Sequence, residues 1–226
     1  LNEIYAEILE EYASEGEIDG IPLVVVDYRG LIEEPKFEKL TKALATSQVP
    51  AGRDEQKAFW LNAYNILAMK LIVDNYPVKS IKDLGGLFSR VWGKDAGEVS
   101  GKTYSIGHIE HKIIRPMGDP RVHAAINCAS VSCPDLRREP YIGEKIEQQL
   151  DEETRKWLSK ESKGFYIEGD DLYVSKVFDW FEKDFEETHG SVHSFIREYA
   201  PEEKKTSLTN NLDIEYLDYH WGINGE

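Results

Sequence analysis

The most informative part of the sequence is DEQKAFWLNAYNILAMKLIVDN, residues 54–75. As a helix it places Ala58, Leu61 and Ile72 on one face, and aromatic and aliphatic side chains continue around most of the cylinder. A helix that is apolar on most sides is normally buried. We therefore expect residues 54–75 to form a helix at the centre of the domain.

Two amides, Asn62 and Asn65, lie within this apolar helix. Buried amide groups need hydrogen-bond partners, because water cannot reach them. We expect these two side chains to hold a neighbouring loop or to face a binding site.

Helical patterns outnumber strand patterns in the rest of the chain. Helices are predicted near residues 1–14, 37–44, 106–114, 142–158, 177–185 and 192–199. Strands are predicted near residues 23–28, 102–106 and 122–126, with a hairpin at 165–174. The Gly-rich residues 85–101, which include Phe88, are predicted to form a loop packed partly on the core.

This pattern predicts a helix-rich α+β fold in one domain, with a small mixed or antiparallel sheet. Residues 1–50 are expected to be an N-terminal helical extension packed on a main α+β domain of residues 51–226.

Composition excludes several classes of function. The net charge of −15 disfavours nucleic acid and anionic membrane surfaces as partners. No apolar run approaches the length of a membrane span, and two cysteines do not make a disulfide-rich scaffold. Gly-rich phosphate-binding motifs are absent, so we expect no nucleotide cofactor. The chain begins at Leu1 rather than Met, so we expect either an exported protein whose signal has been removed or a cytoplasmic protein.

The segment His108-Ile109-Glu110-His111 is the first candidate for chemistry. On a helix His108, His111 and Arg115 share a face, and Glu110 points about a quarter turn away. A histidine that acts as a base needs an acceptor that fixes its tautomer, and a carboxylate can provide it. The alternative is a set of ordinary surface or core histidines.

The second candidate is NCASVSCP, residues 127–134, which follows the predicted strand 122–126. Backbone N–H groups that converge at such a turn would lower the pKa of Cys128 and form an oxyanion pocket near Ser130 to Ser132. Three alternatives stay open: a structural buried thiol, a local disulfide with Cys133, and a zinc site. The zinc site would combine the two cysteines with His108 and His111.

His123 lies on the predicted strand, five residues before Cys128. Alternation along a strand turns it to the opposite face, which favours a core histidine. Trp180, Phe181 and Phe185 are expected to face inward as packing residues.

Several motifs resemble the DUF547 family. AFWLNAYN at residues 58–65 resembles its AFWINAYNA helix, and IEH and IIR at 109–111 and 113–115 resemble its IEHxILR element. DPRVHAAINCASVSCP at residues 119–134 is similar to DPRIHFALNCASxSCP. Residues 176–184 and the tail YHWGIN at 219–224 also resemble family elements, in the same order along the chain.

The resemblance implies a kinship with papain-like or transglutaminase-like thiol enzymes, and a papain-like fold. Cys128 would then be the nucleophile and His111 the base, with Glu110 or the amides of Asn62 and Asn65 orienting that base.

Cys133 matches a position where some family members have serine, which argues against an obligatory disulfide or metal site. His220 stands where the family has Asp, and Ala124 where Phe is common. An orienting role for that Asp cannot apply here.

These observations favour a cysteine-dependent hydrolase or acyl transferase that acts on an amide, peptide or ester without a cofactor or metal. Arg115, His123 and Ser132, together with the two helix amides, are expected to bind the small-molecule or peptide substrate. The main alternative is a non-catalytic binding module for a protein partner, in which the Cys, His and Glu side chains form a structural polar cluster.

Overall fold

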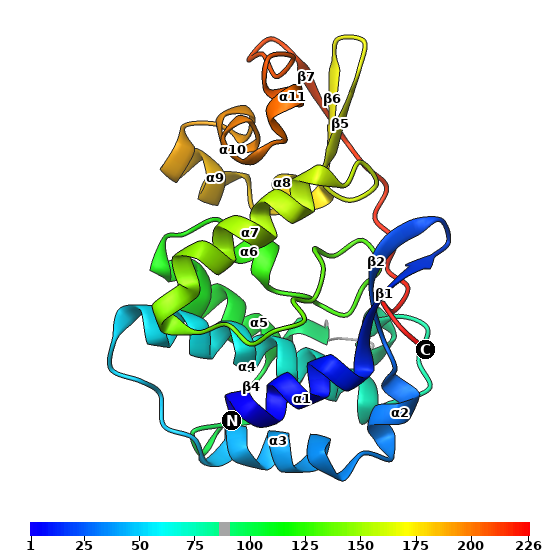
Figure 1. The fold of residues 1–226 in the computed structure, drawn as a ribbon, viewed down its shortest axis with the longest axis vertical. Coiled ribbons are helices and arrows are strands. Elements are labelled where there is room, and N and C mark those ends of the chain that lie inside the picture. The colour runs from blue at the N-terminus through cyan, green and yellow to red at the C-terminus, as the bar shows by residue number, and fades with distance from the viewer. Residues whose placement is uncertain (86–90) are drawn as a thin grey trace.

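The computed structural model describes residues 1–85 and 91–226 (Figure 1). Its α-helices are α1 (Asn2–Tyr12), α2 (Tyr28–Ile32), α3 (Pro35–Thr46), α4 (Arg53–Val73), α5 (Ile106–His108), α6 (Val122–Ala125), α7 (Ile146–Ser159), α8 (Lys176–Trp180), α9 (Glu182–His189), α10 (Val192–Tyr199) and α11 (Glu202–Lys205). Shorter 3₁₀ and π helices are η1 (Ile81–Leu84), η2 (Val91–Gly93), η3 (Ile109–Ile114), η4 (Arg115–Met117) and η5 (Gly143–Lys145). Phe88 of the predicted loop lies outside the described residues.

The strands form small sheets. Strands β1 (Ala13–Ile18) and β2 (Ile21–Val26) pair antiparallel, as do β3 (Gly97–Val99) and β4 (Lys102–Tyr104). Strand β6 (Asp171–Val174) pairs antiparallel with β5 (Phe165–Glu168) and parallel with β7 (Asp213–Tyr216). The predicted fold class, helix-rich α+β with small mixed or antiparallel sheets, is confirmed.

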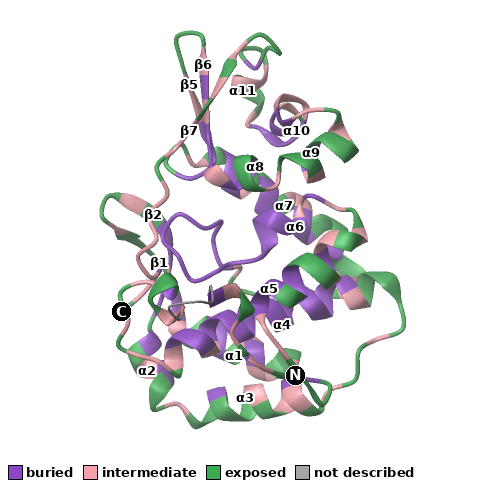
Figure 2. Ribbon diagram, turned by 180° about the vertical axis from the view of Figure 1, so that it is seen from behind, coloured by how far each residue is buried: buried purple, intermediate pink, exposed green. Residues whose placement is uncertain are grey.

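Helix α4 lies at the centre of the larger hydrophobic core, as its pattern predicts. It begins after Gly52, and Asp54 and Glu55 in its first turn favour that helix end electrostatically. Nearly every residue between Lys57 and Ile72 is buried, and Figure 2 shows α4 mostly buried while α3 and α9 carry exposed faces. Helices α1 and α3 and strand β2 pack into the same core.

A second core joins the elements that follow α7. It contains Trp157 of α7, Phe165 of β5, and Phe178, Phe185 and Phe195 of the helices that follow. Helix α7 bridges the two cores, because its Leu150 belongs to the first core and its Trp157 to the second.

Residues 122–126 are not the predicted strand. Residues 122–125 form the short helix α6, and the chain becomes extended only at Ile126. The carboxylate of Asp119 accepts a hydrogen bond from the backbone N–H of Arg121, which favours a helical start, and Ala124 and Ala125 are strong helix formers.

The predicted helix at 106–114 is also different in detail. One α-helical turn, α5, continues as the π-helix η3 and then as the 3₁₀ turn η4. Because a π-helix has a wider turn, the side chains do not follow the faces of an ideal α-helix.

All residues from 122 to 136 are buried, although most of them belong to no regular element. The C-terminal tail pairs with this segment: the N–H groups of Val131 and Ser132 donate to the carbonyls of Gly222 and His220. The tail continues beside β2, where a Cβ on Gly225 would lie 1.9 Å from the Val26 carbonyl oxygen. The tail therefore satisfies backbone groups of a loop that water does not reach.

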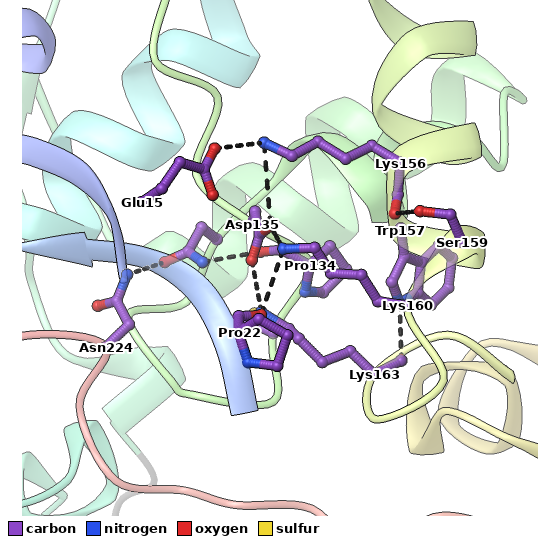
Figure 3. A network of polar contacts seen from close by, with 12 residues as sticks. Glu15, Pro22, Pro134, Asp135, Lys156, Trp157, Ser159, Lys160, Lys163 and Asn224 are labelled. Atoms are coloured by element: carbon purple, nitrogen blue, oxygen red, sulfur yellow. Dashed lines mark hydrogen bonds and ion pairs between the residues drawn. The ribbon is translucent and has the colours of Figure 1, made fainter. Parts of the chain in front are cut away.

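A buried ion cluster fixes the far end of this loop (Figure 3). The Asp135 carboxylate accepts hydrogen bonds from Lys160 and, at 2.6 Å, from Lys163. Asp135 and Lys163 are only 5% and 2% exposed. Burial alone would raise the pKa of Asp135, but Lys163 and Lys160 outweigh it and hold that pKa below its usual range.

We expect Asp135→Asn to lower the free energy of unfolding at pH 7 by about 3 kcal/mol, because it leaves a lysine charge buried without its partner. Urea unfolding measures this, with Glu15→Gln as control, since Glu15 is the exposed partner of Lys156. The stabilisation by Asp135 is present above the unfolded carboxyl pKa of about 4 and is lost as the pH falls through the lower folded pKa. Equal stability of Asp135→Asn and the native protein at pH 7 would contradict the cluster's role.

Candidate active site

A pocket of about 760 Å³ lies between α4, η3, the buried loop, α8 and the C-terminal tail. Among the side chains that line it are Glu110, His111, His123 and Cys128. The structure therefore brings together all three predicted catalytic residues and one of the predicted binding residues.

Cys128 lies where the chain turns sharply after α6. The next residue, Ala129, has a φ of +61°, a left-handed conformation that is unfavourable for a residue with a Cβ. Its N–H donates to the side-chain oxygen of Asn127 at 2.8 Å, which stabilises the turn. The bend turns the thiol of Cys128 to the pocket.

Asn65 of α4 holds the chain just before the thiol. Its amide nitrogen donates to the Ala125 carbonyl at 3.0 Å, and its amide oxygen accepts from the N–H of Asn127 at 2.8 Å. One buried side chain thereby replaces the backbone pairing that the chain loses where α6 ends.

Asn127 connects this bend to two other segments. Its amide nitrogen donates to the Pro134 carbonyl at 2.8 Å, and its oxygen accepts from Asn224 of the tail at 3.3 Å. Asn224 in turn accepts a 2.6 Å hydrogen bond from the Tyr28 hydroxyl. The position of the thiol thus depends on a chain of buried amides.

Three donors surround the Cys128 sulfur. It lies 3.0 Å from Cys133 Sγ, 3.1 Å from Ser130 Oγ and 3.6 Å from the Tyr219 hydroxyl. The hydrogen bond from Cys133 is the largest influence, and with those from Ser130 and Tyr219 it lowers the pKa of Cys128 to about 7 despite burial. Burial and the neighbouring Cys128 sulfur raise the pKa of Cys133 well above its usual value, so Cys133 is the donor of the pair.

Glu110 is buried in the same pocket, with 7% of its surface exposed. Burial raises its pKa to about 8, the charge on Cys128 adds to the shift, and Arg115 and Tyr64 oppose it. The carboxyl group therefore carries a proton at neutral pH, beside a thiol that is close to losing one.

His111 is held by Arg115 rather than by Glu110. Arg115 Nη1 lies 3.1 Å from His111 Nδ1, and two further bonds of 2.6 and 2.8 Å join the guanidinium to Asp184. Because a guanidinium only donates, Nδ1 must accept, and this hydrogen-bond network assigns the proton to Nε2. Burial and then Arg115 lower the pKa of His111, which favours the neutral imidazole.

His123 does not lie on the opposite face from Cys128, because residues 122–125 are helical rather than extended. Its Nε2 is 2.8 Å from the Asp184 carboxylate, and its ring stacks on Phe181 with 4.2 Å between the ring centroids. Burial lowers the pKa of His123, and Asp184 opposes the shift.

The other predicted site residues support the scaffold. Asn62 exchanges hydrogen bonds of 2.8 and 2.9 Å with the backbone of Tyr141, so it holds a loop, as Asn65 does. The prediction that these amides orient His111 is wrong. Ser132 Oγ accepts from the N–H of His220 at 2.8 Å.

The turn amides of the expected oxyanion pocket contribute only in part. The backbone N–H of Ser130 bonds Cys128 and helps to lower its pKa. The N–H groups of Val131 and Ser132 are already paired with the tail, and that of Cys133 donates to the Ser130 carbonyl. Side-chain donors accompany the Ser130 N–H around the Cys128 sulfur.

A zinc site is not assembled. His108 is exposed and packs its ring on Tyr104, with 5.4 Å between the ring centroids, and both cysteines are free thiols. Within residues 1–85 and 91–226, no three His, Cys, Asp or Glu side chains are placed to hold a metal ion.

Sequence reasoning missed the side chains that reach the site from distant segments. Asp184 of α9 and Tyr219 of the tail both lie in segments that resemble family elements, and this was the only available signal. Trp180 does not face inward as predicted: it is 43% exposed and stacks at the pocket with Trp221, at a centroid distance of 5.4 Å.

We expect the effect of Glu110→Gln on the free energy of unfolding to depend on pH. Relative to the native protein, the variant should be more stable at pH 8 than at pH 5 by up to about 4 kcal/mol. The unfolded carboxyl loses its proton near pH 4.5, but the buried one keeps it until about pH 8, so the native protein loses stability over this interval. Urea unfolding at both pH values measures the difference, with the exposed Glu10→Gln as control. A pH-independent effect of Glu110→Gln would mean that Glu110 is ionised in the folded protein.

Comparison with known families supplies one match. The model of a family described as "Protein of unknown function, DUF547" matches residues 49–158. Neither a curated protein nor a solved structure matches the chain. The matched range contains α4, η3 and both cysteines, whereas Asp184 and Tyr219 lie beyond it.

Within the described residues, no helix is long and apolar enough to cross a membrane.

Proposed function

We propose, starting from the match of the DUF547 family model to residues 49–158, that the chain is a cysteine-dependent hydrolase or acyl transferase for an amide, peptide or ester. The family's description assigns no activity, so the proposal depends on the site itself. The observation that supports it is the pairing, in one pocket, of a thiol whose pKa is lowered to about 7 with a carboxyl group whose pKa is raised to about 8. A kinship with papain-like or transglutaminase-like enzymes would assign the same nucleophile.

In the first step, the Cys128 thiolate attacks the carbonyl carbon of the substrate. A carbon–sulfur bond forms, and the carbonyl electron pair moves to the oxygen. Side-chain donors that keep their protons stabilise this oxyanion: His111 through Nε2–H, and Tyr64, whose pKa burial raises well above its usual value.

Glu110 then acts as the general acid. Its carboxylic acid gives a proton to the leaving nitrogen or oxygen as the bond to the carbonyl carbon breaks, which leaves a thioester on Cys128. In the second half, the Glu110 carboxylate takes a proton from water or from an acceptor amine as that group attacks the thioester. The carbon–sulfur bond breaks, and the thiolate and the carboxylic acid are restored.

This assignment changes the role that the sequence predicts for His111. With its Nδ1 occupied by Arg115, His111 is a donor and not a base for Cys128. His123 is a second candidate for the base: its Nε2 is directed to Asp184, so its Nδ1 keeps a lone pair.

We expect Cys128 to be alkylated with an apparent pKa near 7, measured from the rate of iodoacetamide labelling against pH and localised by peptide mass mapping. The matched pair Cys133→Ser and Cys133→Ala tests the cause, because serine keeps a donor and alanine removes it. The apparent pKa should stay low in the first variant and rise by about one unit in the second.

In the same measurement, His111→Ala should leave the apparent pKa of Cys128 nearly unchanged, since a neutral donor does not form an ion pair with the thiolate. An ordinary thiol pKa near about 8.5 and slow labelling in every variant would identify a structural thiol. That outcome would favour the non-catalytic binding module.

We expect hydrolysis of p-nitrophenyl esters to depend on Cys128, with Cys128→Ala reduced to the background rate and Glu110→Gln reduced roughly a hundredfold. The pH profile of kcat/KM should be bell-shaped. The value should fall below about pH 7 as Cys128 gains a proton and above about pH 8 as Glu110 loses one. Glu10→Gln, on the exposed face of α1, serves as control. Full activity of Cys128→Ala would refute the mechanism.

A further inference from the structure

The two thiols are placed for a second kind of chemistry. Cys128 Sγ and Cys133 Sγ are 3.0 Å apart, and the backbone N–H of Cys128 donates to Cys133 Sγ at 3.1 Å. The turn between them is closed by the N–H of Cys133, which donates to the Ser130 carbonyl at 3.1 Å. A disulfide needs the sulfurs to approach to about 2.05 Å, so a movement of roughly one ångström is sufficient.

The pair is asymmetric. Two hydroxyls, those of Ser130 and Tyr219, lie within hydrogen-bond distance of Cys128 Sγ. Cys133 Sγ instead accepts from the Cys128 N–H and lies 4.0 Å from the Ile126 carbonyl. Stabilisation of the thiolate is therefore concentrated on Cys128, and the thiolate is the form that oxidants attack. Cys133 is the neighbour that can react next.

Both cysteines are buried and line the pocket. Cys128 and Cys133 are 7% and 6% exposed, and both line the cavity of about 760 Å³. A peroxide molecule is small enough to enter this cavity, and the Cys133 sulfur is already 3.0 Å from that of Cys128. An oxidised Cys128 would therefore react with Cys133 rather than with another chain.

We propose that Cys128 is a site of reversible oxidation by peroxides and that Cys133 resolves the oxidised thiol as an intramolecular disulfide. The proposal depends on the two thiols alone and does not require the acyl-transfer function.

The reaction has two steps. The Cys128 thiolate attacks one oxygen of hydrogen peroxide: a sulfur–oxygen bond forms, the oxygen–oxygen bond breaks, and sulfur is oxidised to sulfenic acid while hydroxide leaves. Cys133 then attacks the Cys128 sulfur: a sulfur–sulfur bond forms, the sulfur–oxygen bond breaks, and the departing hydroxide leaves as water with the Cys133 proton. In total, two thiols and one peroxide give one disulfide and two waters.

The first step prepares the second. Part of the rise in the pKa of Cys133 comes from the charge on Cys128. A sulfenic acid is neutral, so this repulsion disappears once Cys128 is oxidised, and the N–H of Cys128 still donates to Cys133 Sγ. A dithiol reductant reverses the disulfide by thiol exchange. The disulfide removes the thiolate that the proposed acyl transfer requires.

The test treats the reduced chain with hydrogen peroxide and records its intact mass. We expect the loss of two hydrogen atoms, protection of both cysteines from iodoacetamide, and full reversal by dithiothreitol. Cys133→Ser should stop at the sulfenic acid and give a dimedone adduct on Cys128. Cys128→Ser should lose no hydrogen and give no adduct on Cys133.

Accumulation of a dimedone adduct or a sulfinic acid on Cys128 of the native chain, without disulfide, would overturn the proposal. First reaction at Cys133 in Cys128→Ser would do the same. If Cys133→Ser does not fold, as judged by circular dichroism, the native chain still tests the proposal. Its loss of two hydrogen atoms, and the reversal of that loss by dithiothreitol, show whether the disulfide forms. If the disulfide forms but the reduced chain does not hydrolyse esters, this proposal stands and the proposed function fails. If the reduced chain hydrolyses esters but forms no disulfide, this proposal alone is refuted.

Discussion

The side-chain amide of Asn65 bonds the backbone on both sides of the bend between α6 and Cys128. Because residues 122–136 are buried but largely irregular, their polar backbone groups depend on such partners rather than on water. Asn127, Asn224 and the tail supply most of the rest. Helix α4 thus helps to hold the buried loop through a polar group in an otherwise apolar surface, and this loop carries the candidate nucleophile.

Burial raises the pKa of both acids of the pocket, but their net shifts are opposite. Glu110 finds weak compensation from Arg115 and Tyr64, so desolvation dominates and its pKa rises. Cys128 has three side-chain donors around its sulfur, so hydrogen bonding dominates and its pKa falls. A carboxylic acid and a thiol ordinarily have very different pKa values, and these two shifts make the values similar. Proton transfer between site and substrate costs least under this condition.

The fold could be predicted where apolar periodicity is long, and the site only where a family resemblance links its motifs. Helix α4 follows directly from the pattern of residues 54–75, and Glu110, His111 and Cys128 were placed in one site by family resemblance. Residues 122–126 were predicted as a strand because a short apolar run fits either structure, and the Asp119 contact that begins α6 has no periodic signal.

The side chains that define the chemistry could not be predicted for a different reason. Asp184 contacts His123 and Tyr219 contacts Cys128 across 61 and 91 residues of sequence. Spacing along the chain carries no information about such contacts. The protonation of His111 is a further example: Arg115 is four residues away, but its effect depends on which ring nitrogen it meets, and that is set by the π-helical turn and by Asp184. A sequence can therefore name the histidine, while only its hydrogen bonds determine whether it gives or takes a proton.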